Sequence, residues 1–110
     1  MVNVKRFDIG LIQLDPTIGS EIQKTRPCII ISPDSMNLSQ LKTLIIAPMT
    51  STIRESFPTR VNIEFQNKQG QIALDQLRVI DRSRIIKIIG SVQSQKTKHK
   101  ILELLQIMFS

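Results

Sequence analysis

The apolar residues of this chain occur in short runs between turn residues, and this spacing restricts the possible folds more than any other feature. Runs that begin at Ile9, Cys28 and Thr43 each stop after a few residues at Pro, Ser, Asp or Thr. Runs of this length are typical of β-strands, since helices need longer periodic segments. The run at 28–31 is rich in β-branched residues, which predicts a central strand that is buried on both faces.

The second half of the chain alternates apolar and polar residues, which is the pattern of half-buried strands and hairpins. The expected elements are a strand at 61–65, a turn at 67–70, a strand at 71–74, an extended segment at 75–81, a turn at 81–84 and a strand at 85–89. In the extended segment, the alternation predicts that Leu77 and Val79 point inward while Gln76 and Arg78 point outward.

The period of the apolar residues changes near the end of the chain. Ile101, Leu104, Leu105 and Met108 fall at i, i+3, i+4 and i+7, which places them on one face of an amphipathic helix. Many short strands before one helix predict a mainly β fold, a small β-barrel or curled sheet with a C-terminal α-helix, rather than alternating βαβ units. With 110 residues and no compositional break, residues 1–110 should form a single domain.

The net charge favours a polyanionic partner. Fifteen Lys and Arg against nine Asp and Glu give +6, which suits nucleic acid or an acidic protein, although a basic protein without a specific ligand fits the charge equally well. Four Phe, with no Trp or Tyr, give little support for an aromatic platform that stacks bases. Nucleic acid should therefore be held mainly by charge and hydrogen bonds.

The single cysteine and the N-terminal residues bear on the compartment. Cys28 has no partner for an intrachain disulfide or a cysteine-based zinc site, and its apolar neighbours predict a buried thiol. Lys5, Arg6 and Asp8 precede any apolar pattern, unlike in a secretory signal. Because no apolar segment approaches the roughly 20 residues that span a bilayer, we expect a cytoplasmic protein without membrane contact.

Arg26 and Thr50 are the best candidates for chemistry. Arg26 precedes one predicted strand, and Thr50 and Ser51 end another, so a guanidinium and clustered hydroxyls could handle one phosphate if the strands bring them together. RNA cleavage by the ribose 2′-hydroxyl needs such stabilisation of the phosphorane, and Glu21 could accept the hydroxyl proton. Taken singly, Arg26 also fits a surface arginine and Thr50 a turn cap, and the sequence leaves these alternatives open.

Two other mechanisms have less support in the sequence. His99 is the only histidine and lies among lysines, which excludes a mechanism with two histidines. The acidic residues are scattered without metal-ligand spacing, so we expect chemistry without a metal or another cofactor.

Four ordered blocks, at 14–21, 26–32, 47–51 and 74–81, resemble the MazF/PemK family of toxin endoribonucleases. The resemblance covers nearly the whole chain. It implies a homodimer of SH3-like β-barrels of the CcdB/PemK type that cuts single-stranded mRNA at a short sequence without a metal. It also implies neutralisation by an acidic, partly disordered cognate antitoxin, with contact to DNA only through that antitoxin.

The same resemblance implies roles for individual residues. Arg26 and Thr50 match the catalytic pair, and Glu21 matches a base proposed in some members. The predicted RNA-binding residues are Ser20, Ser51, Pro58, Asp75, Gln76 and Arg78. The chain departs from the family pattern at 7–8 and at 22–25, and because the second segment contacts RNA in relatives, the cut sequence does not carry over.

Two alternatives share the expected fold class. A CcdB-like toxin would bind DNA gyrase without cutting RNA, but such toxins end in a tail that contains tryptophan, whereas this chain has none and ends Met108-Phe109-Ser110. A barrel that binds RNA without cutting it is the other alternative, and the scarcity of aromatic residues counts against it. A test for RNA cleavage separates all three.

Overall fold

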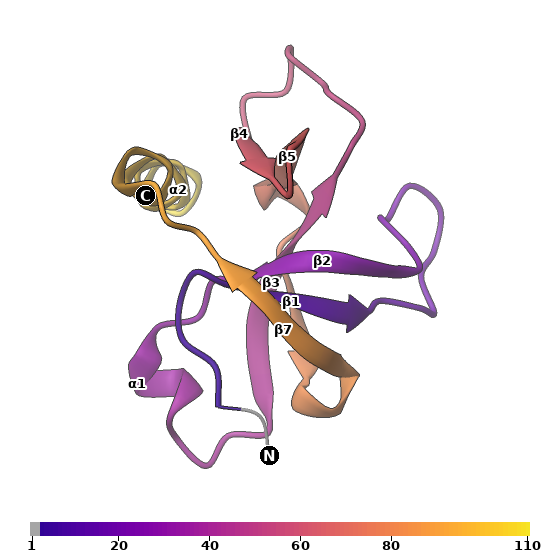
Figure 1. The fold of residues 1–110 in the computed structure, drawn as a ribbon, viewed down its shortest axis with the longest axis vertical. Coiled ribbons are helices and arrows are strands. Elements are labelled where there is room, and N and C mark those ends of the chain that lie inside the picture. Colours follow the sequence, from indigo (N-terminus) through magenta and orange to yellow (C-terminus); the bar gives the residue numbers. More distant parts are fainter. Residues whose placement is uncertain (1–2) are drawn as a thin grey trace.

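The computed structural model describes residues 3–110 as an antiparallel sheet with a long helix at the C-terminus. The strands are β1 (Asp8–Gln13), β2 (Thr25–Ile30), β3 (Thr43–Thr50), β4 (Arg60–Phe65), β5 (Lys68–Ala73), β6 (Arg78–Asp81) and β7 (Ile85–Ser91). The helical elements are α1 (Asp34–Asn37), α2 (Gln95–Met108) and the 3₁₀ turns η1 (Leu74–Gln76) and η2 (Arg82–Arg84). Figure 1 shows α2 beside the β4–β5 hairpin, with α1 at the lower left of this view. No helix within 3–110 is long and apolar enough to cross a membrane.

Strand β3 organises the sheet because it pairs with three neighbours. The strands follow the order β4-β5-β3-β2-β1-β7, and β6 pairs with the first half of β3. On the edge opposite β2, β3 changes partner from β6, where Ile46 faces Arg78, to β5, where Met49 faces Ile72. Pro48 lies between these two pairings, where its missing N–H disrupts neither ladder.

Two hydrophobic clusters lie on opposite faces of the central strands. One lies between the sheet and α2 and includes Ile29 and Ile31, whereas the other includes Cys28 and Ile30. Successive residues of a strand point to opposite faces, so β2 contributes to both clusters. The predicted burial of 28–31 on both faces is confirmed, but the strand spans Thr25–Ile30, so it begins earlier than predicted and ends before Ile31.

Helix α2 packs by the face that the sequence predicts. Ser94 caps its N-terminus, with Oγ accepting a hydrogen bond from the Thr97 N–H at 3.2 Å. Ile101 and Leu104 are buried, and Leu105 and Met108 pack against the same cluster. The helix therefore covers one end of the sheet and completes the hydrophobic cluster to which β4 and β5 also contribute residues.

Two details differ from the sequence prediction. The hairpin turn is shorter than 67–70: Gln66 and Asn67 have φ of 53° and 62°, which makes a two-residue turn, so β5 already begins at Lys68. Val79 does not point inward, since its side chain is 59% exposed and the neighbouring Ile80 is buried. The 3₁₀ turn η1 interrupts the extended segment, and a shift of one residue exchanges the two faces of a strand.

Candidate active site

The start of β2 and the end of β3 meet because the two strands are antiparallel. Cys28 faces Pro48 in the ladder, and the same register, continued outward, places Arg26 beside Thr50. Both side chains line the same two neighbouring hollows of the surface. The sheet thus brings together the arginine and the hydroxyl that the sequence singles out.

Three neighbouring hollows share lining residues and form one groove, which we call the groove below. The central hollow has a volume of about 520 Å³ and contains Arg26, Thr50 and Glu21. One end, of about 250 Å³, continues past Ser51 to Lys68, and the other, of about 420 Å³, reaches Arg78. An extended groove with positively charged side chains along it is suited to bind a linear polyanion.

Most of the predicted RNA-binding residues lie along this groove. Ser20, Asp75 and Gln76 line both the central hollow and the end at Arg78. Pro58 lies elsewhere: it is exposed on the loop between β3 and β4 and lines none of the three hollows.

The donors of Arg26 and Thr50 are suited to a phosphate. Among the hydrogen bonds of residues 3–110, the Arg26 side chain makes one, from Nε to the Gln23 carbonyl at 2.8 Å, which leaves both terminal amino groups for a ligand. Thr50 Oγ1 accepts a hydrogen bond from the Thr52 N–H at 3.1 Å, so its own proton is free to be donated. Glu21 accepts a hydrogen bond from the Ile18 N–H through Oε1, and this contact orients its carboxylate within the loop.

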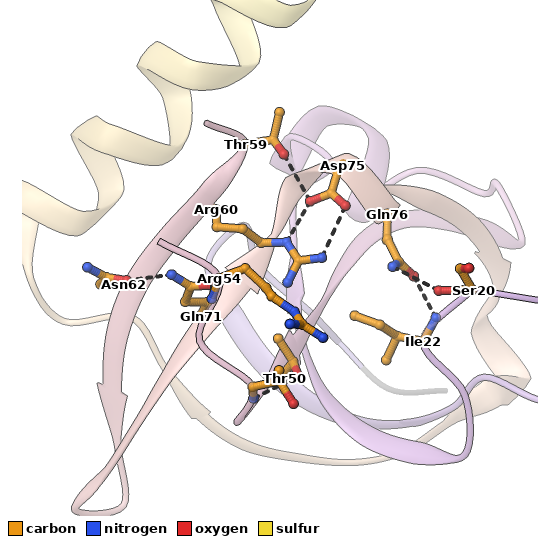
Figure 2. Close-up of polar contacts among 11 residues, drawn as sticks. Ser20, Ile22, Thr50, Arg54, Thr59, Arg60, Asn62, Gln71, Asp75 and Gln76 are labelled. Carbon is orange, nitrogen blue, oxygen red and sulfur yellow. Dashed lines mark hydrogen bonds and ion pairs between the residues drawn. The ribbon is translucent and has the colours of Figure 1, made fainter. Parts of the chain in front are cut away.

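The structure adds cationic residues to the site that the sequence did not single out. Arg54 and Arg60 both line the central hollow. Arg54 lies in the β3–β4 loop, and Arg60 is the first residue of β4. Gln71, which is buried, holds this loop: its Oε1 accepts from the Arg54 N–H at 2.9 Å, and its Nε2 donates to Asn62 Oδ1 at 2.9 Å (Figure 2). A polar residue at a buried strand position was the one signal for this contact.

Asp75 is held by an ion pair on the wall of the groove. Its carboxylate accepts from Arg60 Nε at 2.8 Å and Nη2 at 3.2 Å, and from Thr59 Oγ1 at 3.0 Å (Figure 2). Partial burial acts to raise the pKa of Asp75, but the hydrogen bonds from Arg60 and Thr59 and the charge of Arg60 outweigh it, so the pKa lies below its ordinary value of 3.8. Asp75 is therefore ionised at neutral pH.

Comparison with known proteins places the chain in a family. A model of the PemK-like, MazF-like toxins of type II toxin–antitoxin systems matches residues 5–109. The chain belongs to this family. Among similar proteins, Endoribonuclease MazF of Staphylococcus saprophyticus is 33% identical to this chain over 100 residues. The aligned segment covers 86% of this chain and 82% of the relative.

Solved MazF structures share the fold of this MazF-like chain. MazF from Deinococcus radiodurans superimposes with a TM-score of 0.80 at 19% identity, over 99% of this chain and 98% of that one. A mycobacterial endoribonuclease in complex with its cognate antitoxin gives a TM-score of 0.77 at 19% identity, over 96% and 94% of the two chains. The predicted small β-barrel fold with a C-terminal helix is therefore confirmed.

Cys28 is a buried thiol beside the MazF-like site. Its side chain is buried, as the sequence predicts, and burial raises the pKa of the thiol to about 12, although Arg78 and Arg26 act to lower it. Because the thiolate is the reactive form, this thiol is inert at neutral pH.

Gly70 allows β5 to approach the end of β3, and we expect Gly70→Ala to disturb it. A Cβ at Gly70 would lie 2.8 Å from the Thr50 carbonyl oxygen, so the backbone that carries Thr50 would have to move. We expect a loss of about 1–3 kcal/mol in the free energy of unfolding, measured by urea denaturation. Gly10→Ala is the matched control, because a Cβ there meets its nearest atoms at 3.5 Å. Equal stability of the two variants would contradict the expectation.

Proposed function

We propose that this MazF-like chain is the toxin of a toxin–antitoxin pair and cuts single-stranded RNA by attack of the ribose 2′-hydroxyl on the adjacent phosphodiester. The observation that carries the proposal is the placement of the free terminal amino groups of Arg26 and the hydroxyl of Thr50 in one hollow. The 33% identity to an endoribonuclease supports RNA cleavage as the activity.

Each residue of the pair would act on the phosphate in its own way. The planar guanidinium of Arg26 donates two parallel hydrogen bonds to the non-bridging oxygens, where charge builds up in the phosphorane. Thr50 adds a neutral donor to the same group. Glu21 would take the 2′-hydroxyl proton, since its second carboxylate oxygen is available beside the one that accepts from Ile18.

The reaction exchanges one bond at phosphorus for another. The 2′-oxygen forms a bond to phosphorus, the bond to the 5′-oxygen breaks, and a proton is delivered to that leaving oxygen. The products are a 2′,3′-cyclic phosphate and a 5′-hydroxyl. Phosphorus keeps its oxidation state, and the step needs no co-reactant.

RNA would lie along the groove, with its phosphates near the cations. Arg54 and Lys68 line the groove on the sides of Arg26, and Ser20, Ser51 and Arg78 offer further polar contacts. Pro58 follows Phe57, which lines the central hollow, so an RNA that extends past the groove reaches it there.

We also propose a homodimer and an acidic antitoxin as partners. Several apolar side chains are exposed on α2 and at its end, among them Ile107 and Phe109, and a second copy would remove such surface from water. A related mycobacterial endoribonuclease was solved with its cognate antitoxin, and the charge of +6 suits an acidic partner here. Any contact with DNA would be made by that antitoxin.

The decisive test is cleavage of single-stranded RNA in excess EDTA. We expect cleavage to persist, with products that end in a 2′,3′-cyclic phosphate and a 5′-hydroxyl, because arginine and threonine supply the stabilisation that a metal would otherwise give. Product ends are read by mass spectrometry. Cleavage that stops in EDTA and returns with magnesium would contradict the mechanism, and intact RNA together with gyrase binding would favour a CcdB-like toxin.

A further inference from the structure

The side chains of the turn η1 form hydrogen bonds with both loops that flank the groove. One residue of this turn, Asp75, holds the end of the β3–β4 loop through Arg60 and Thr59. The next residue, Gln76, holds the β1–β2 loop: its Oε1 accepts from the Ile22 N–H, and its Nε2 donates to the Ser20 carbonyl at 3.3 Å. Figure 2 shows the two side chains pointing in different directions from adjacent positions.

The anchor of this connection is well packed. Leu74, which opens η1, is fully buried in the cluster beneath the groove. The Arg60 side chain is only 7% exposed, and its guanidinium lies 5.0 Å from the centre of the Phe57 ring. An arginine whose side chain is buried, stacked on a ring and bonded to both oxygens of a carboxylate has little freedom to reorient toward a ligand.

Both oxygens of the Asp75 carboxylate accept hydrogen bonds in these contacts. Oδ1 accepts from both Arg60 Nε and Thr59 Oγ1, and Oδ2 accepts from Arg60 Nη2. Protonation of this carboxylate would remove the charge that pairs with Arg60, and that same negative charge repels RNA phosphates. The contacts therefore suit a structural brace better than a direct partner of the substrate.

We infer that Asp75 and Gln76 are positioning residues that together set the spacing of the β3–β4 and β1–β2 loops across the groove, with Asp75 acting through Arg60 and Gln76 through the Ile22 amide. This inference rests on the proposed function for its effect on cleavage. It attributes the effect of these two residues on RNA cleavage to the loops that they hold in place.

Hydrogen exchange tests the brace without reference to activity. In Gln76→Ala the Ile22 amide loses its acceptor, so its exchange should accelerate at least about tenfold, measured by NMR. Gln76→Glu keeps an oxygen that can accept from this amide, so the Ile22 amide should exchange more slowly in Gln76→Glu than in Gln76→Ala. Unchanged exchange at Ile22 in Gln76→Ala would overturn the inference, whether or not the protein cuts RNA.

Kinetics test whether Asp75 acts through Arg60. Misplacing the loop should lower kcat/KM by about 10- to 10²-fold in Asp75→Ala. In the Arg60→Ala background, Asp75→Ala should cause a further change of no more than about twofold, since only the hydrogen bond from Thr59 then remains to be lost. Independent losses that multiply in the double variant would overturn the inference.

The pH profile separates positioning from proton transfer. Asp75→Asn keeps the shape of the side chain and one carbonyl oxygen for Arg60, so it should retain more activity than Asp75→Ala, with the acid limb of kcat/KM unchanged. Glu64→Gln, at an exposed position of β4 that lines none of the three hollows of the groove, is the control for the same change in net charge. Disappearance of the acid limb in Asp75→Asn, but not in Glu64→Gln, would make Asp75 a catalytic residue and overturn the inference. If the unmodified protein cuts no RNA, the proposed function fails, while the exchange result still decides on the brace.

Discussion

Arg26→Lys should lose RNA cleavage by roughly 10²-fold or more, nearly as much as Arg26→Ala, even though lysine keeps the positive charge. The terminal amino groups of Arg26 form a planar fork that matches two phosphate oxygens, and a single ammonium reproduces the charge without the geometry. The Nε contact to the Gln23 carbonyl fixes the direction of this fork, and lysine has no equivalent second donor group. The measurement is single-turnover cleavage of a saturating RNA.

Two further variants make this result specific. Arg6→Lys is the control, because Arg6 lines none of the three hollows of the groove and should keep normal turnover. Thr50→Val removes the hydroxyl at nearly constant volume, and with it both the proton donor of the pair and the acceptor of the Thr52 N–H, so it should also be slow. Near-normal turnover of a folded Arg26→Lys protein would show that charge alone is sufficient at this position.

The pairing of Arg26 with Thr50 could be predicted because it depends on the simplest features of the chain. Short apolar runs identify β2 and β3, and antiparallel strands bring the start of one to the end of the other. The same runs predict which residues are buried, as with Ile29 and Ile30 on the two faces of β2. Local pattern and a ladder register were enough for this part of the site.

Arg54 and Arg60 could not be predicted, because their positions depend on contacts between distant segments. The loop that carries Arg54 is fixed by Gln71, and Arg60 is fixed by Asp75, and neither contact has a signature within a few residues of the arginine. The prediction that Val79 points inward is wrong for a related reason. The 3₁₀ turn η1 is built from a buried leucine and long-range hydrogen bonds, so alternation across it misleads.

An acidic antitoxin should inhibit cleavage by occupying the same groove as RNA. Carboxylates of an extended peptide can replace phosphates at Arg26, Arg54 and Lys68, and the peptide would order as it binds. We expect cleavage to fall to background at equimolar antitoxin, and the affinity for the antitoxin to weaken as salt rises, since the Debye length shrinks from about 10 Å at 0.1 M to about 3 Å at 1 M. The measurement is antitoxin binding across a salt series, with the small acidic protein that we expect to be encoded beside this chain.

Charge reversal in the groove should separate this mechanism from inhibition at a distance. Arg54→Glu places a like charge against the acidic peptide and should weaken antitoxin binding about 10²-fold. Lys87→Glu makes the same change in net charge at an exposed position of β7 that lines none of the three hollows of the groove, and it should have a much smaller effect. An RNA with a 2′-deoxy group at the cut position cannot be cleaved, so it should displace the antitoxin in direct competition. Simultaneous binding of both, with independent affinities, would mean that the antitoxin inhibits from another surface, because two polyanions cannot occupy one groove of this volume together.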